Sequence, residues 1–291
     1  MTRVRLGAVS YLNARPCVVG LDRHPRFDVR FDLPARCAAL LHDGAIDLGL
    51  VPSIEYLRGP AGADAYRIVP GVAIASFGPV ASVALYVRRP LSDVRSIALD
   101  TSSRTSVALT RVLCARAWHI DPSFEPAGPD LLTMLERCDA ALLIGDAALF
   151  LDPASVRLKP DTTYAAVSPS HAGRALSGPA LESIEKIDLG ETWTNTTGLP
   201  FVYAFWAGPP GPVVAEDVRA IQKARDAGVA DSEGVARDYL SDESLHAMGA
   251  RYLRDNIKYS LGEPERAGLE TFYRYAAELG LVPESSGLRF F

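Results

Sequence analysis

The sequence feature that most constrains the fold is a short apolar run that leads through a hydroxyl-rich turn into a helical pattern. Residues 97–100 form the run, and five of the six side chains at residues 101–106 carry a hydroxyl group. Apolar residues then recur at helical spacing over residues 107–115. This order predicts a strand, a turn and a helix.

The turn also predicts a binding site. The first residues of a helix have unpaired backbone N–H groups and lie at the positive end of the helix dipole. A single Ser or Thr at such a place indicates only a helix cap. Five hydroxyl groups together with Arg104 exceed what a cap needs, so we expect a site for a carboxylate or a phosphate.

The order of strand and helix continues on both sides of this stretch and predicts an α/β fold with parallel strands. Further strands are expected at Val4–Val9, Phe27–Leu33, Ile46–Pro52, Val83–Val87, Ala140–Ile144 and Leu199–Ala207. Helices are expected at residues 34–41, 54–57, 131–135 and 147–151, and in the last third of the chain at residues 215–227, 234–240, 242–252 and 265–279.

The length of 291 residues favours two domains over one. We expect the second of two lobes to be inserted in the first, with residues 1–86 and 206–291 in lobe 1 and residues 87–205 in lobe 2. The strands at Val83–Val87 and Phe201–Trp206 are expected to be the two crossings between the lobes. Residues 153–183 lack sustained periodicity and are rich in Pro, Ser, Thr, Ala and Gly, which predicts an inserted mobile surface loop.

Several classes of function are disfavoured by composition. The net charge of −5 argues against nucleic acid as the main partner. No apolar stretch reaches the length that a membrane span needs, and no signal-peptide pattern opens the chain, so we expect a cytoplasmic protein. The four cysteines lie far apart, without spacing typical of a metal site or a disulfide framework, so neither zinc nor disulfides are expected.

Gly145 and Asp146, at another junction of strand and helix, are a second candidate anion site or helix cap. Three places are expected to meet in a cleft between the lobes: the loop that contains Asn13, the strand at Ser82, and the turn at Ser103–Ser106. Their neutral hydroxyl, amide and backbone N–H groups suit a small polyanion. These groups alone do not establish catalysis.

Five motifs together resemble the chorismate dehydratase family, which opens the futalosine route to menaquinone. They span most of the chain in order, at residues 10–16, 44–56, 74–83, 100–106 and 197–203. The resemblance implies a two-lobed type 2 periplasmic-binding-protein-like fold in a cytoplasmic enzyme. Two stretches depart from it: residues 153–183, and the helical last third, in which we recognise no functional motif.

The resemblance further implies that chorismate, a dianion, loses water to give 3-[(1-carboxyvinyl)oxy]benzoate without a metal or organic cofactor. Asn13 and Ser82 are then the active-site residues. Asn13 would orient the substrate or bind the departing hydroxyl, since an amide is not a strong base. The expected substrate-binding residues are Ser103, Arg104, Thr105, Ser106, Gly145 and Asp146.

The proton acceptor stays open between two candidates. Asp146 could serve if burial raised the pKa of its carboxyl group. The enolpyruvyl carboxylate of the substrate could instead take the proton at high effective concentration. We favour the substrate carboxylate, because the matching motifs contain no evident His or Lys base.

Three other functions fit parts of the pattern. A solute-binding protein for small anions would share the fold but usually acts outside the cytoplasm. The related 1,4-dihydroxy-6-naphthoate synthase also shares it, although the Ser-Tyr-Leu-Asn sequence at residues 10–13 favours the dehydratase. A DNA-binding regulator would need a helix-turn-helix and a basic patch, which the sequence does not show.

Overall fold

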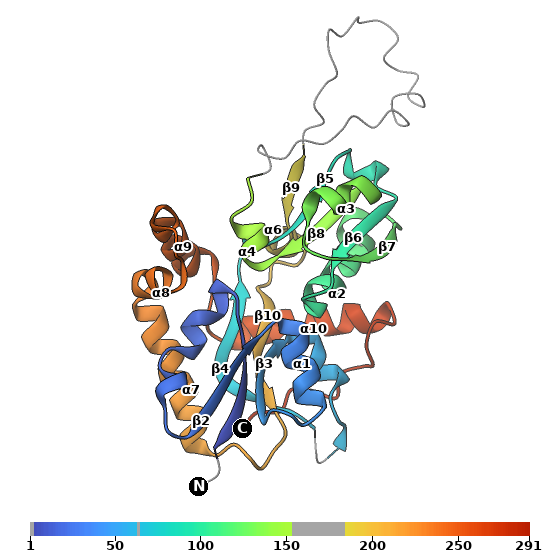
Figure 1. Cartoon of the computed structure of the whole chain (residues 1–291). Helices are drawn as coiled ribbons and strands as arrows, with labels where there is room; N and C mark the ends of the chain where they lie inside the picture. Colours follow the sequence, from blue (N-terminus) through green and yellow to red (C-terminus); the bar gives the residue numbers. More distant parts are fainter. Residues whose placement is uncertain (1–2, 63–64, 153–183) are drawn as a thin grey trace, which may run out of the picture.

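The structure, a computed structural model, describes residues 3–62, 65–152 and 184–291. Its strands form two five-stranded sheets, which lie in the lower and upper bodies of Figure 1. The first sheet has the order β2-β1-β3-β10-β4, with β1 (Val4–Val9), β2 (Phe27–Asp32), β3 (Leu48–Pro52), β4 (Arg67–Ser76) and β10 (Phe201–Gly208). The second has the order β7-β6-β8-β5-β9, with β5 (Val83–Val87), β6 (Ser96–Asp100), β7 (Ser123–Ala127), β8 (Ala140–Ile144) and β9 (Glu185–Asp188).

The two sheets share one topology. In the first, β1 pairs in parallel with β2 and β3, whereas β10 runs antiparallel to β3 and β4. In the second, β6 pairs in parallel with β7 and β8, whereas β5 runs antiparallel to β8 and β9. The predicted parallel strands are therefore confirmed for three strands in each sheet, and each sheet also contains an antiparallel strand that the pattern did not predict.

Sheet pairing moves the predicted lobe boundaries by a few residues. Boundaries at 86–87 and 205–206 would cut through β5 and β10, yet all of β5 lies in the second sheet and all of β10 in the first. The chain instead crosses between the sheets at residues 77–82 and 198–200. A buried apolar run predicts a strand, but it does not say which sheet receives that strand.

The helices flank both sheets, and α7, α8 and α9 lie together on one side of the first (Figure 1). The α-helices are α1 (Pro34–His42), α2 (Arg104–Leu113), α3 (Leu131–Arg137), α4 (Gly145–Leu149), α6 (Leu189–Thr197), α7 (Ala215–Ala230), α8 (Ser232–Tyr239), α9 (His246–Arg251) and α10 (Glu263–Glu278). Short 3₁₀ or π turns are η1 (Leu12–Val18), η2 (Leu21–Arg23), η3 (Ser53–Arg58), η5 (Leu91–Asp93), η6 (Cys114–Trp118), η9 (Glu243–Leu245) and η10 (Tyr252–Asn256). None of the helices in the described ranges is long and apolar enough to cross a membrane.

Three strands escaped the sequence pattern, each for a local reason. Strand β4 contains Pro70 and Gly71, and Gly71 has a φ of +74°, which breaks the regular alternation. Strands β7 and β9 lie at the two edges of the second sheet and are only partly buried, so they lack a continuous apolar run. The loop predicted at 153–183 lies outside the described residues.

Candidate active site

A small cavity lies between the lobes, at the carboxyl ends of parallel strands from both sheets. Its volume is about 40 Å³, room for about three water molecules. Both lobes supply its walls: Val9, Tyr11, Asn13, Pro34, Pro52, Ile74, Tyr203 and Ala204 come from the first, and Val83, Ser103, Ser106, Ile144 and Gly145 come from the second. The structure thus shows the cleft closed.

Asn13 and Ser82 reach the cavity region from different elements. Asn13 lies in η1, directly after β1, and lines the cavity. Ser82 is only 1% exposed and lies beside two residues that line the cavity. Val83 follows it in the chain, and the Gly145 N–H donates to the Ser82 carbonyl at 2.8 Å. Ser82 therefore belongs to the wall immediately behind the cavity surface.

The start of α2 supplies two hydroxyl groups to the cavity. Ser103 caps the helix by accepting the Ser106 N–H at 3.4 Å, and their hydroxyl oxygens lie 3.1 Å apart. Both residues are buried and both line the cavity. The predicted hydroxyl-rich helix start is thus present, with two of its hydroxyls turned toward the cleft.

Arg104 and Thr105, predicted to bind substrate, face away from the cavity. The Arg104 guanidinium donates to Glu55 of η3 at 2.7 Å, and the Thr105 hydroxyl accepts the Ile54 N–H at 3.1 Å. Successive helical residues are rotated by about 100°, so one turn cannot direct four neighbouring side chains to one side. These two residues join the lobes at η3.

Glu55 gathers cations from both lobes. Burial raises the pKa of its carboxyl group, but a hydrogen bond from His42 and the charges of Arg104 and Arg58 outweigh burial and lower the pKa to about 2. The Arg58 and Arg104 guanidinium groups lie 2.7 Å from its two oxygens. The site of charge pairing is consequently beside the cleft, and the cavity itself is lined by neutral groups.

Gly145 and Asp146 connect the second lobe to the first. Gly145 has a φ of +61°, and a Cβ there would come within 2.9 Å of the Tyr11 ring. The Asp146 carboxylate accepts the Leu12 N–H at 3.1 Å and the Tyr239 hydroxyl. Burial raises the pKa of Asp146, and these hydrogen bonds and Arg15 oppose that effect. Both oxygens of Asp146 are therefore engaged in joining the lobes.

Tyr11 is placed across the cleft by a directed pair of hydrogen bonds. The Ser102 hydroxyl donates to Asp100 at 2.6 Å, because a carboxylate only accepts. The Tyr11 hydroxyl lies 3.1 Å from the same Ser102 oxygen and must therefore donate to it. Tyr11 belongs to the first lobe, whereas Ser102 and Asp100 belong to the second, so this pair forms when the lobes meet.

The crossing that precedes Ser82 holds a strained backbone. Ala81 has a φ of +63°, a conformation that costs a non-glycine residue about 1–2 kcal/mol. The Asp188 carboxylate accepts the N–H groups of Val80 at 3.0 Å and of Ala81 at 2.6 Å. Lys186 donates to the Ala81 carbonyl at 3.0 Å. These contacts fix the conformation that presents Ser82.

Sequence reasoning missed the tyrosines of this site. Tyr11 and Tyr203 line the cavity, and Tyr239 and Tyr252 contact predicted site residues from the last third of the chain. A tyrosine in an apolar strand or helix is ordinarily a packing residue, so its type gave no signal. The Ser-Tyr-Leu-Asn motif did contain Tyr11, next to the residue that was singled out.

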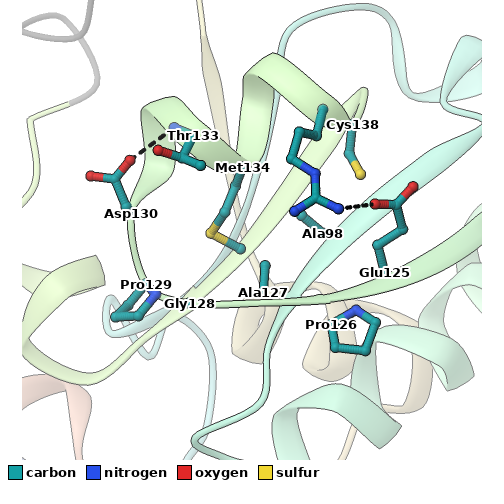
Figure 2. Close-up of a pocket in the computed structure, with 11 residues that line it drawn as sticks. Ala98, Glu125, Pro126, Ala127, Gly128, Pro129, Asp130, Thr133, Met134 and Cys138 are labelled. Carbon is teal, nitrogen blue, oxygen red and sulfur yellow. Dashed lines mark hydrogen bonds and ion pairs between the residues drawn. The ribbon is translucent and has the colours of Figure 1, made fainter.

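A second hollow lies away from the cleft, between β6, β7 and α3 (Figure 2). Its volume is about 280 Å³, and its apolar lining includes Ala98 and Met134. At its rim Arg137 pairs with Glu125 at 3.1 Å, and Asp130 caps α3. The charged groups described at this hollow are thus engaged, and it offers less to an anionic substrate than the cleft does.

No group of three or more His, Cys, Asp or Glu side chains within the described ranges is arranged to hold a metal ion. The four cysteines are buried free thiols.

Comparison with known proteins adds a family. A family model described as menaquinone biosynthesis matches residues 4–278. The chorismate dehydratase of Thermus thermophilus is 32% identical over 283 residues, which cover 92% of this chain and 96% of that protein.

Solved structures show the same fold at low sequence identity. Protein AF1704 from Archaeoglobus fulgidus has a TM-score of 0.65 at 15% identity and covers 96% of this chain and 98% of its own. The aliphatic sulphonate-binding protein SsuA from Escherichia coli has a TM-score of 0.58 at 16% identity, with coverage of 97% and 94%. The predicted periplasmic-binding-protein-like fold is confirmed.

Proposed function

This chain belongs to the menaquinone biosynthesis family, and from that premise we propose that it is a chorismate dehydratase. The reaction would be a hydro-lyase reaction that removes the ring C4 hydroxyl and the C3 hydrogen of chorismate to give 3-[(1-carboxyvinyl)oxy]benzoate. The observation that carries the proposal is a closed, neutral, hydroxyl-lined cavity in a chain 32% identical to a chorismate dehydratase over most of its length.

The groups that line the cavity suit a dianion that must lose water. Ser103 and Ser106, with the N–H groups at the start of α2, would hold one carboxylate of the substrate. Asn13 would hydrogen-bond the departing hydroxyl, and Ser82 would assist from the wall behind. Gly145 permits the close approach of Tyr11 that seals the cleft. Water would be excluded on closure, which strengthens each of these contacts.

The structure favours the substrate's own carboxylate as the proton acceptor. Asp146 is the carboxylate that the sequence nominated, but its oxygens accept hydrogen bonds from Leu12 and Tyr239. These hydrogen bonds make the carboxylate a weaker base, and Asp146, which does not line the cavity, would have to turn from this contact to reach the substrate. The enolpyruvyl carboxylate needs no such rearrangement and would lie close to C3.

The cavity is too small for a substrate to enter as it stands, so binding requires the lobes to open and close again. We place the protein in the cytoplasm because the proposed role is biosynthetic.

Incubation of the purified protein with chorismate tests the proposal, with product formation followed by aromatic absorbance and mass spectrometry. A new aromatic product lighter than chorismate by one water is expected. Unchanged chorismate after long incubation would refute the dehydratase assignment. Saturable quenching of protein fluorescence in that case would indicate a binding protein.

A further inference from the structure

One buried hydroxyl group contacts Ser82, one of the two residues that the sequence nominated as catalytic. Tyr252 begins η10 and is 3% exposed. Its hydroxyl donates to the Ser82 Oγ at 2.7 Å. Tyr252 comes from the last third of the chain, where no functional motif was recognised.

The direction of this bond follows from the one hydrogen that the phenol carries. Burial raises the pKa of Tyr252 well above its ordinary value, so the phenol keeps that hydrogen at neutral pH. The hydrogen lies on the bond to the Ser82 oxygen, so Tyr252 donates and Ser82 accepts.

This direction leaves the Ser82 hydroxyl hydrogen without a side-chain acceptor among the residues that the structure describes. Within the described residues, Tyr252 is the side-chain partner of the Ser82 hydroxyl. In this bond the Ser82 oxygen is the acceptor, so its own hydrogen takes no part. A buried hydroxyl hydrogen without an acceptor costs free energy until a partner arrives. Ser82 is therefore prepared to donate to an oxygen atom of a ligand.

We propose that Tyr252 is a positioning residue that fixes Ser82 and sets its hydroxyl as a donor toward the departing hydroxyl group. This inference rests on the proposed dehydratase function. Tyr252 itself does not line the cavity, and it acts through Ser82, which it contacts.

The test is a cycle of Tyr252→Phe, Ser82→Ala and the double variant, with kcat and KM measured for chorismate. Each single variant is expected to lower kcat about tenfold. Loss of one hydrogen bond between neutral groups costs up to about 1.4 kcal/mol, and that energy corresponds to a tenfold change in rate. KM should change less than twofold. The double variant should be no slower than the slower single variant, because both substitutions remove one and the same interaction.

Tyr86→Phe is the matched control. Tyr86 is fully buried and donates to the Ala148 carbonyl at 3.1 Å, and that carbonyl keeps Lys186 as a second donor. The variant should lower the melting temperature about as much as Tyr252→Phe while leaving kcat unchanged. If a general loss of stability lowered kcat, both variants would be slower than the wild type. If lost positioning of Ser82 lowers kcat, only Tyr252→Phe will be slower.

Three outcomes would overturn the inference. Tyr252→Phe with the kcat of the wild type would show that the hydroxyl has a structural role alone. Fully additive losses in the double variant would show that Tyr252 does not act through Ser82. A wild-type protein that leaves chorismate unchanged would refute the proposed function and this inference together. The activity of the wild type therefore distinguishes that outcome from the other two. Ser82→Ala supplies an independent arm if Tyr252→Phe does not fold.

Discussion

Gly145→Ala is the sharpest test that closure of the lobes produces activity. The substitution has two separate costs. Alanine at a φ of +61° is about 1–2 kcal/mol less favourable than glycine, whether the lobes are open or closed. In the closed state alone, the new Cβ would also lie 2.9 Å from two carbons of the Tyr11 ring. Such overpacking costs about 1–3 kcal/mol.

Gly44→Ala separates these two costs. Gly44 follows α1 with a φ of +68°, and a Cβ there would meet nothing within 4 Å. Both variants should melt about 2–8 °C below the wild type. Only Gly145→Ala should lose activity, with kcat/KM lower by about 10–100-fold, because every 1.4 kcal/mol against closure is a factor of about ten.

The assay is turnover of chorismate, alongside thermal unfolding of each variant. Equal kcat/KM in Gly145→Ala and Gly44→Ala would refute the reasoning, since it would mean that contact between Tyr11 and Gly145 does not belong to the active state.

Three further predictions follow from other contacts between the lobes. Asp188→Asn should lower kcat about tenfold, because it loosens the strained Ala81 backbone that precedes Ser82. Adding Ala81→Gly to this variant should not restore kcat; a restored kcat would mean that Asp188 serves only to offset the strain at Ala81. The pKa of Glu55 is about 2, below the ordinary 4.5, so its contribution to stability is complete above about pH 4.5 and is lost as the pH falls toward 2. Urea unfolding at pH 6 and pH 3 should show this loss, and Glu55→Gln should reduce it; an unchanged pH dependence would contradict the cluster. Asp146→Asn should keep more than about a tenth of the wild-type kcat, since it weakens one contact; complete inactivity at normal chorismate binding would reinstate Asp146 as the base.

Much of this architecture is readable from short local patterns. Apolar runs followed by helical spacing gave the parallel strands of both sheets, and the loop that carries Asn13 meets the turn that carries Ser103 and Ser106 at one cavity. These features depend on residues close together in the sequence, where periodicity and capping preferences act directly.

The remainder depends on contacts between distant segments. Tyr252 and Ser82 are 170 residues apart, and no local pattern links them. Arg104 was predicted to bind the substrate because it lies among hydroxyl residues, but its guanidinium group forms an ion pair with a carboxylate of η3. That carboxylate, Glu55, appears in the sequence as one acidic residue in a short helix. Pairing of this kind is decided by how the lobes dock, which the sequence pattern does not specify.

The double crossing of the chain has a mechanical consequence. Residues 77–82 and 198–200 connect the two sheets at separate points, and two connections leave one easy rotation, about the line that joins them. Twisting or sliding of one body against the other would stretch both connections. Release of product and capture of substrate are then the two directions of one bending motion, and side chains far from that line travel furthest.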